Sequence, residues 1–245
     1  MRKVIASIVV LLAVSASQMW ASSALGHNNS GTTSIAAGGT ALTVTSIPSG
    51  NYVMGNVTWN TSGRSLSSCS ATSSTCVVVT GCHNTLSAAG ATDCFYILST
   101  GATITSITLT PSATTSGNWY ISDYSTNAGP MAFDNSCTSL PASSASPVGC
   151  TLSLTGSNDV IQQLIACANT CSGAVAGWTN VIYGSGDGAA DLQNTASGTG
   201  PTWSMSPAGT SIVSGFALKE TGGGGASTGS TDKRRKLARL GVIGN

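Results

Sequence analysis

The segment Ala102-Thr103-Ile104-Thr105-Ser106-Ile107-Thr108-Leu109-Thr110 decides the fold class, because apolar and hydroxyl side chains alternate along it. A period of two places one set of side chains on each face of a β-strand. The alternation slips once, near Thr105-Ser106, as it does at a β-bulge. The segment therefore predicts a half-buried strand with one irregularity.

Similar short segments recur on both sides of this one, with Gly, Ser and Asn between them. Only residues 160–167 are ambiguous, because Gln162-Gln163 interrupts the alternation and a helical turn would also fit. About ten short strands with turn residues between them predict an all-β, antiparallel, jelly-roll-like β-sandwich, with little helix outside the N-terminal segment. The expected strands are residues 41–45, 52–59, 76–80, 94–98, 102–110, 118–124, 150–155, 160–167, 174–183 and 211–218.

The first 24 residues have the pattern of a secretory signal peptide. Arg2 and Lys3 precede the apolar run Val4 to Val14, which is too short to span a bilayer. Small residues offer two cleavage points, at Val14-Ser15-Ala16 and at Ser22-Ser23-Ala24. We therefore expect a secreted, extracellular or periplasmic protein, with no membrane span once the signal is removed.

Composition divides the rest of the chain into three parts. Residues 25–39 are a polar lead-in, 40–220 the expected β-sandwich domain, and 221–245 a glycine-rich linker with a basic, disordered tail. The chain is 41% hydrophobic and only 7% charged, which argues against general disorder. Between His27 and Glu220, two basic and seven acidic residues give a net charge of −5. This is not the basic face of a nucleic-acid-binding domain.

Eight cysteines behind an export signal predict disulfide bonds. They fall into sequential neighbours, which favours bridges that staple individual loops, although the sequence alone leaves the pairing open. A zinc site that adds His83 to the first four cysteines is disfavoured, because the spacings are wider than those of zinc motifs. The neighbours are Cys69 and Cys76, Cys82 and Cys94, Cys137 and Cys150, and Cys167 and Cys171.

The motifs of hydrolases are missing from the sequence. His27 and His83 are the only histidines; one lies in the polar lead-in and the other in an expected turn. A glycosidase would need two carboxylates across a cleft, for which Asp123 with Asp134, or Asp159 with Asp191, are conceivable pairs. Isolated aspartates at turns more often bond to local backbone. We therefore expect no enzyme.

One segment has partial metal character. In Ser185-Gly186-Asp187-Gly188-Ala189-Ala190-Asp191-Leu192, Asp187 and Asp191 match the second half of a calcium loop. Tyr183 stands where the first carboxylate should be, so an Asp-Gly turn between strands explains the segment as well. Calcium is the one cofactor that the sequence suggests, and it does so weakly.

Aromatic residues offer a candidate surface for ligands. In Trp119-Tyr120-Ile121-Ser122-Asp123-Tyr124 the period of two puts Tyr120 and Tyr124 on the face opposite Trp119 and Ile121. That second face is either exposed or covered by an opposing sheet. Tyr120, Tyr124 and Trp178 are the candidate ligand-binding residues if it is exposed.

Five segments between residues 118 and 218 resemble known sequences: Trp119-Tyr120-Ile121-Ser122-Asp123-Tyr124-Ser125, Thr155-Gly156-Ser157-Asn158-Asp159-Val160-Ile161, Ala190-Asp191-Leu192-Gln193-Asn194-Thr195, Gly200-Pro201-Thr202-Trp203 and Ile212-Val213-Ser214-Gly215-Phe216-Ala217-Leu218. Through them, residues 118–218 resemble a group of exported bacterial proteins with a concanavalin-like or jelly-roll β-sandwich. The resemblance implies a sandwich fold and assigns no active site.

These patterns together favour a secreted, non-catalytic binding module for extracellular glycans or other surface components. A self-assembling structural or surface-coat protein is the alternative, since low charge and Thr/Ser-rich strands suit packing between copies. An extracellular hydrolase comes third.

Overall fold

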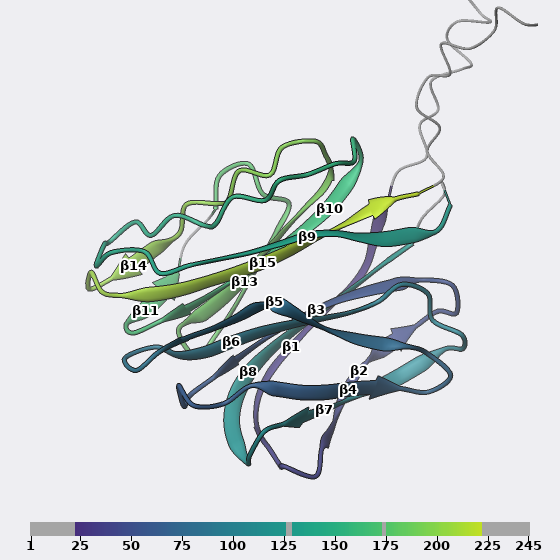
Figure 1. Cartoon of the computed structure of the whole chain (residues 1–245), viewed down its shortest axis with the longest axis horizontal. Coiled ribbons are helices and arrows are strands. Elements are labelled where there is room, and N and C mark those ends of the chain that lie inside the picture. The colour runs from purple at the N-terminus through teal and green to yellow at the C-terminus, as the bar shows by residue number, and fades with distance from the viewer. Residues whose placement is uncertain (1–22, 126–128, 173–174, 222–245) are drawn as a thin grey trace, which may run out of the picture.

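The protein is all-β in a computed structural model that describes residues 23–125, 129–172 and 175–221 (Figure 1). No helix occurs in these residues, and every strand pair is antiparallel. The strands are β1 (Ala24–Ile35), β2 (Thr40–Ile47), β3 (Tyr52–Trp59), β4 (Leu66–Ala71), β5 (Cys76–Leu86), β6 (Gly90–Ile97), β7 (Ile104–Pro111), β8 (Thr115–Ser125), β9 (Met131–Ser139), β10 (Asp159–Cys167), β11 (Thr170–Ser172), β12 (Asn180–Gly184), β13 (Asp187–Thr195), β14 (Ser204–Ser206) and β15 (Ser211–Glu220).

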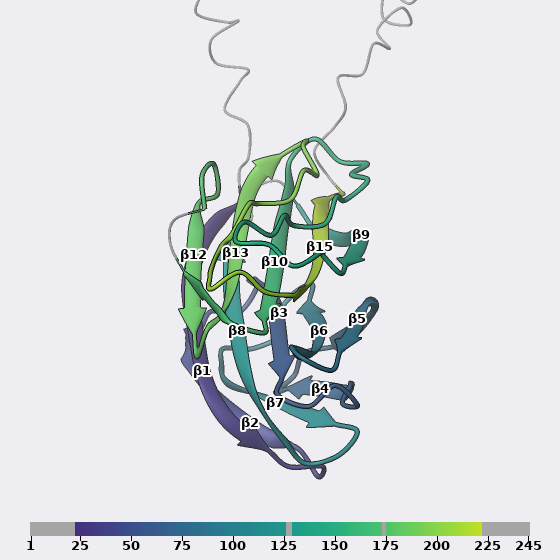
Figure 2. The ribbon, with the colours of Figure 1, turned by 90° about the vertical axis from the view of Figure 1, so that its left-hand side faces the viewer.

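The strands form three stacked sheets, which we call the small, middle and outer sheets (Figure 2). The small sheet has the order β2-β7-β4, the middle sheet β1-β8-β3-β6-β5, and the outer sheet β12-β13-β10-β15-β9. A further pair, β11-β14, lies outside them. The expected antiparallel β-sandwich is confirmed, whereas the jelly-roll order is not confirmed.

The middle sheet is covered on both faces. All eight residues of β3 are buried, which is typical of a strand between two other layers. On the face toward the small sheet, Val57, Trp59 and Phe95 belong to one apolar cluster with Ile107 and Leu109 of β7. This cluster is the main hydrophobic core.

Most of the alternating segment 102–110 lies in β7, the central strand of the small sheet. Its isoleucines and Leu109 are buried, as the period of two predicts. The irregularity near Thr105-Ser106 is also present, but the extra residues are on the partner strand. Thr43 pairs with Ser106 and Ile47 with Ile104, so β2 bulges opposite Thr105.

Residues 25–35 of the expected polar lead-in are part of edge strand β1 of the middle sheet, rather than a segment that precedes the first strand. Backbone pairing with β8 and side-chain bonds hold this strand, rather than apolar burial. Ser122 Oγ donates to Asn28 Oδ1 at 2.6 Å, and Thr32 Oγ1 donates to Asn118 Oδ1 at 2.6 Å. A hydrophobic pattern cannot reveal such a strand. Residues 1–22, with most of the expected signal peptide, lie outside the described residues.

Other expected strands are confirmed or corrected in detail. Strand β3 has the predicted bounds, and residues 160–167 are in strand β10 rather than a helical turn. Residues 150–155 form no strand; they run as a covering segment whose Leu152 is buried. The strand expected at residues 174–183 is shorter and later, at Asn180–Gly184. Strands β4, β9, β11, β13 and β14 were not anticipated, because polar residues weaken their apolar alternation.

All four sequential cysteine pairs are disulfides. The Cα–Cα distances are 5.6 Å for Cys69–Cys76 and Cys82–Cys94, 5.8 Å for Cys137–Cys150 and 6.1 Å for Cys167–Cys171. The described residues contain no free cysteine. Four disulfides are typical of extracellular proteins. In the described part of the chain, no helix has the length and hydrophobicity needed to cross a membrane.

Candidate functional site

The aromatic residues chosen from the sequence do not share an exposed face. Tyr120 and Tyr124 are fully buried between the middle and outer sheets, so they are wrong as surface ligands. The Tyr120 hydroxyl donates to the Gly184 carbonyl at 3.2 Å, and the Tyr124 ring stacks on Tyr52 with a centroid distance of 5.2 Å. Trp178 is half-buried against the outer sheet. The period of two placed the tyrosines on the correct face, but that face is covered.

Asp187 and Asp191 do not form the expected calcium site. Both lie on β13, four residues apart, so their Cα atoms are about 13 Å apart along the strand. Calcium ligands, in contrast, lie within about 2.6 Å of the ion. Asp187 accepts bonds from Thr58 Oγ1 at 2.7 Å, Asn118 Nδ2 at 2.8 Å and Cys167 N at 2.9 Å. The described residues contain no cluster of three or more metal-ligating side chains.

Both histidines are paired with buried aspartates, and neither pairing was predicted from the sequence. His27 Nδ1 lies 2.9 Å from Asp123 Oδ1 across β1 and β8, and His83 Nδ1 lies 2.9 Å from Asp93 Oδ1 across β5 and β6. Burial raises the pKa of Asp93, which also accepts a bond from Trp59 Nε1 at 2.6 Å. A histidine oriented by a carboxylate is one part of a catalytic triad.

The remaining part of a triad is missing in the described residues. No hydroxyl or thiol there hydrogen-bonds to either imidazole, and every cysteine is in a disulfide. A nucleophile needs a base within hydrogen-bonding distance. The two His–Asp pairs therefore serve as cross-strand bonds in this arrangement.

A close carboxyl pair does exist, and its members differ from either pair conceived from the sequence. Asp134 of β9 lies beside Asp159 of β10 and forms an ion pair with Lys219, whose Nζ is 3.0 Å from Asp134 Oδ1. Burial, followed by the neighbouring carboxylate of Asp134, raises the pKa of Asp159 to about 7. Burial alone would raise the pKa of Asp134, but bonds from Thr155 and Lys219 outweigh it and lower that pKa to about 2. The Asp134 and Asp159 side chains are both buried, so this pair is out of a substrate's reach.

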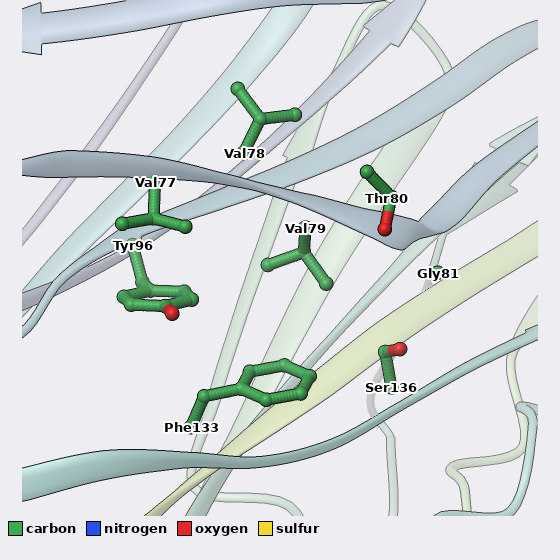
Figure 3. A pocket seen from close by; sticks show the side chains of 8 residues that line it. All are labelled: Val77, Val78, Val79, Thr80, Gly81, Tyr96, Phe133 and Ser136. Carbon is green, nitrogen blue, oxygen red and sulfur yellow. The ribbon is translucent and has the colours of Figure 1, made fainter.

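A solvent-accessible groove lies between two edge strands, β5 of the middle sheet and β9 of the outer sheet. It encloses about 300 Å³. Figure 3 shows Val77 and Val79 on the same side of β5 as the rings of Tyr96 and Phe133, while Val78 points to the opposite side. We call this the β5–β9 groove; it is lined by Val77, Val78, Val79, Thr80, Gly81, Tyr96, Phe133 and Ser136.

Two aromatic rings form the floor of the β5–β9 groove at one end. Tyr96 and Phe133 stack with a centroid distance of 5.8 Å and an interplanar angle of 16°. Phe133 is 37% exposed, although aromatic side chains of this size are usually covered. At the other end, Ser136 lies so close to Gly81 that a Cβ at that position would collide with its hydroxyl. A glycine is therefore needed where β5 and β9 approach.

The β5–β9 groove has a free strand edge beside it. Strand β5 pairs with β6 on one side, and no described strand pairs with its other edge. In Figure 2, β9, β5 and β4 lie one above another along the same side of the molecule. An unpaired edge offers a row of backbone donors and acceptors to another extended chain. Neither Tyr96 nor Phe133 was singled out from the sequence, which predicted a strand at residues 76–80 but not its position at a sheet edge.

A second hollow is polar and separate from the first. It encloses about 210 Å³, and its lining includes Asn60, Ser87, Ser185 and the buried carboxylate of Asp187. No residue lines both hollows, and no aromatic side chain lines this one. Ser185 has a φ of 48° in the tight turn between β12 and β13. Burial raises the pKa of Asp187. Its carboxylate oxygens already accept hydrogen bonds from Thr58, Asn118 and the Cys167 amide.

No protein-family model, curated protein or solved structure matches this chain.

Proposed function

We propose that this protein is an exported, non-catalytic binding module that takes an extended polypeptide segment into the β5–β9 groove. The observation that carries the proposal is the combination of an apolar groove with an unpaired strand edge along the same strand, β5. Strand addition supplies main-chain hydrogen bonds at such an edge, and pockets beside it receive alternate side chains.

The lining of the groove favours a polypeptide over a glycan. Its side chains are valines and two aromatics, and the polar groups among them are hydroxyls only. Sugars are bound through aromatic faces together with several convergent polar groups. Here the aromatics line one hollow, and the amide of Asn60 and carboxylate of Asp187 line the other. A glycan ligand is therefore the less favoured form of the same binding function.

Export and absence of catalysis are parts of the same proposal. Four disulfides support an oxidising compartment. The buried carboxyl pair and the two His–Asp pairs lack a nucleophile or a substrate path among the described residues. Net charge of −5 between His27 and Glu220 supports a partner other than nucleic acid.

The proposal predicts that Phe133→Ser weakens binding of an extended apolar probe. The probe is a fluorescent heptapeptide of alternating threonine and valine, measured by fluorescence anisotropy with the whole protein. Phe133→Ser should weaken binding at least tenfold, because it removes the exposed ring at the groove. The matched control is Leu140→Ser, which changes an apolar side chain that is 53% exposed and outside the groove.

Three outcomes contradict the proposal. The first is equal binding by the Phe133→Ser and Leu140→Ser proteins. The second is no binding by either the native chain or a variant with Leu240→Asp and Val242→Asp in the C-terminal tail. The third is a glycan-array signal that disappears with Phe133→Ser, which would assign the groove to sugars.

A further inference from the structure

The chain leaves the folded domain beside the β5–β9 groove. Strand β15 ends at Glu220, which pairs with Met131, and Leu218 pairs with Phe133. The last described strand therefore ends two positions from the aromatic floor of the groove. Whatever follows Thr221 begins its path close to this site.

We infer that residues 237–243 of the same chain bind in the β5–β9 groove and compete there with an external partner. The inference rests on the proposed function, because it assigns one occupant to the same groove. The segment reads Leu237-Ala238-Arg239-Leu240-Gly241-Val242-Ile243 and lies outside the described residues.

The segment has the chemistry that the groove requires. Leu237, Leu240, Val242 and Ile243 are branched apolar side chains, and Arg239 is the single charge. No other stretch after Glu220 has this apolar content. The groove itself has no charged lining residue, so an apolar segment can enter without burying an unpaired ion. Two branched side chains of the segment would replace water over the rings of Tyr96 and Phe133.

The connection is long enough to reach. Fifteen residues, 222–236, separate the described domain from the segment, and they include the glycine run Gly222 to Gly225. Fully extended they would span about 50 Å, and as a flexible chain their ends average about 20 Å apart. The five groove residues of β5, Val77 to Gly81, cover only about 16 Å along the strand. The linker can therefore turn back and present the segment to the groove.

The tail and the domain have opposite formal charge. Residues 27–220 carry a net charge of −5, whereas residues 221–245 carry five basic residues and one acid, a net of +4. Lys233-Arg234-Arg235-Lys236 stands directly before the apolar segment. A flexible tether of this length gives an effective concentration of about 1 mM. An external peptide must exceed that competition, so the segment sets a threshold for binding.

Hydrogen exchange of the whole protein tests the contact directly. The double substitution Leu240→Asp and Val242→Asp places charge in the segment without touching the described fold. We expect amides of residues 77–81 to exchange at least tenfold faster in this variant than in the native chain. The control is Ser230→Asp, which adds charge to the linker and should leave exchange unchanged. Equal protection in the native and doubly substituted proteins would overturn the inference.

Probe binding separates this inference from the proposed function. The threonine–valine heptapeptide should bind the Leu240→Asp, Val242→Asp protein about tenfold tighter than the native chain. Equal affinity for both would sink the inference and leave the proposed function standing. Faster exchange in the Leu240→Asp, Val242→Asp protein, with no probe binding by either protein, would support the contact of the segment with the groove and contradict the proposed binding of an external polypeptide. Concentration-dependent assembly that disappears in the variant would place the segment in a neighbouring copy and overturn the intramolecular contact.

Discussion

The middle sheet packs on the small sheet mainly through apolar side chains, and on the outer sheet through apolar side chains together with a series of buried hydrogen bonds. Toward the small sheet, the buried cluster contains Val57, Trp59, Phe95 and Ile121. Toward the outer sheet, Thr58 and Asn118 bond to Asp187. In the same interface, the Thr92 and Ser214 hydroxyls lie 2.5 Å apart, and Gln162 Nε2 donates to Ser122 Oγ at 3.1 Å.

The two interfaces stabilise the fold by partly different means. Apolar burial gives roughly 25 cal/mol per Å² and tolerates small shifts, because it has no direction. Buried hydrogen bonds contribute little net free energy when made but cost about 1–3 kcal/mol when one partner is lost. Apolar burial therefore stabilises both interfaces, and the hydrogen bonds of the outer one also fix the position of one sheet on the other. An aromatic cluster with Tyr52, Tyr124 and Phe216 reinforces the outer interface.

The largest effect is expected at the inner interface. Trp59→Ala should lower the free energy of unfolding by about 3–5 kcal/mol, because it empties the site of a fully buried indole. It also removes the donor to Asp93. Urea unfolding followed by circular dichroism measures the change. The comparison variant is Trp178→Ala, whose half-buried ring should cost clearly less; equal losses would mean that the inner cluster is not the main core.

A smaller loss is expected at the outer interface. Asp187→Ala should cost about 2–4 kcal/mol, because it leaves Thr58, Asn118 and the Cys167 amide without their acceptor. Thr58→Val combined with Asp187→Asn in a double-mutant cycle should show a coupling energy of about 0.5–3 kcal/mol. Strict additivity of the two substitutions would contradict a hydrogen-bonded interface.

The smallest effect is a pH dependence confined to the outer sheet. The folded pKa of Asp159, about 7, lies above its usual value of 3.8. Its contribution is therefore complete below about pH 4 and is lost as the pH rises toward 7. Asp134 has the opposite sign: with a pKa of about 2, its contribution is lost only as the pH falls below 3.8.

Stability should accordingly fall by roughly 2 kcal/mol between pH 4 and pH 8, which is about half of what the full shift would give at about 1.4 kcal/mol per pKa unit, because solvent screening weakens the interaction. Urea midpoints at the two pH values measure it. Asp159→Asn should remove most of this slope, because an amide does not titrate. A slope of unchanged size in that variant would assign the pH dependence to other groups.

Much of the architecture could be predicted from local patterns. Strand β3 was predicted with its observed bounds, and the sequential neighbours among the cysteines are the observed bridges. Strand β1 was missed because its partners are polar: Asn28 bonds to Ser122 and Thr32 to Asn118. A polar strand has no hydrophobic signature, since its stability comes from bonds to residues far away in sequence.

The candidate site could not be predicted in the same way. Tyr120 and Tyr124 had the right parity, yet the outer sheet covers them, and Phe133 became the exposed ring instead. Asp134 and Asp159 are 25 positions apart and meet only because β9 and β10 flank β15. The resemblance of residues 118–218 to concanavalin-like proteins stays a prediction.

The sequence by itself determined that this chain forms antiparallel strands braced by local disulfides, because alternation and proximity act within a few residues. Tertiary structure decided which face of each strand is buried, which carboxyl groups lie side by side, and where a strand edge stays unpaired. Those properties depend on the stacking of three sheets, which brings residues from distant segments together. Strand β7 is an example. Its period of two predicts a strand, but only the packing of the middle sheet on it decides which of its two faces belongs to the core.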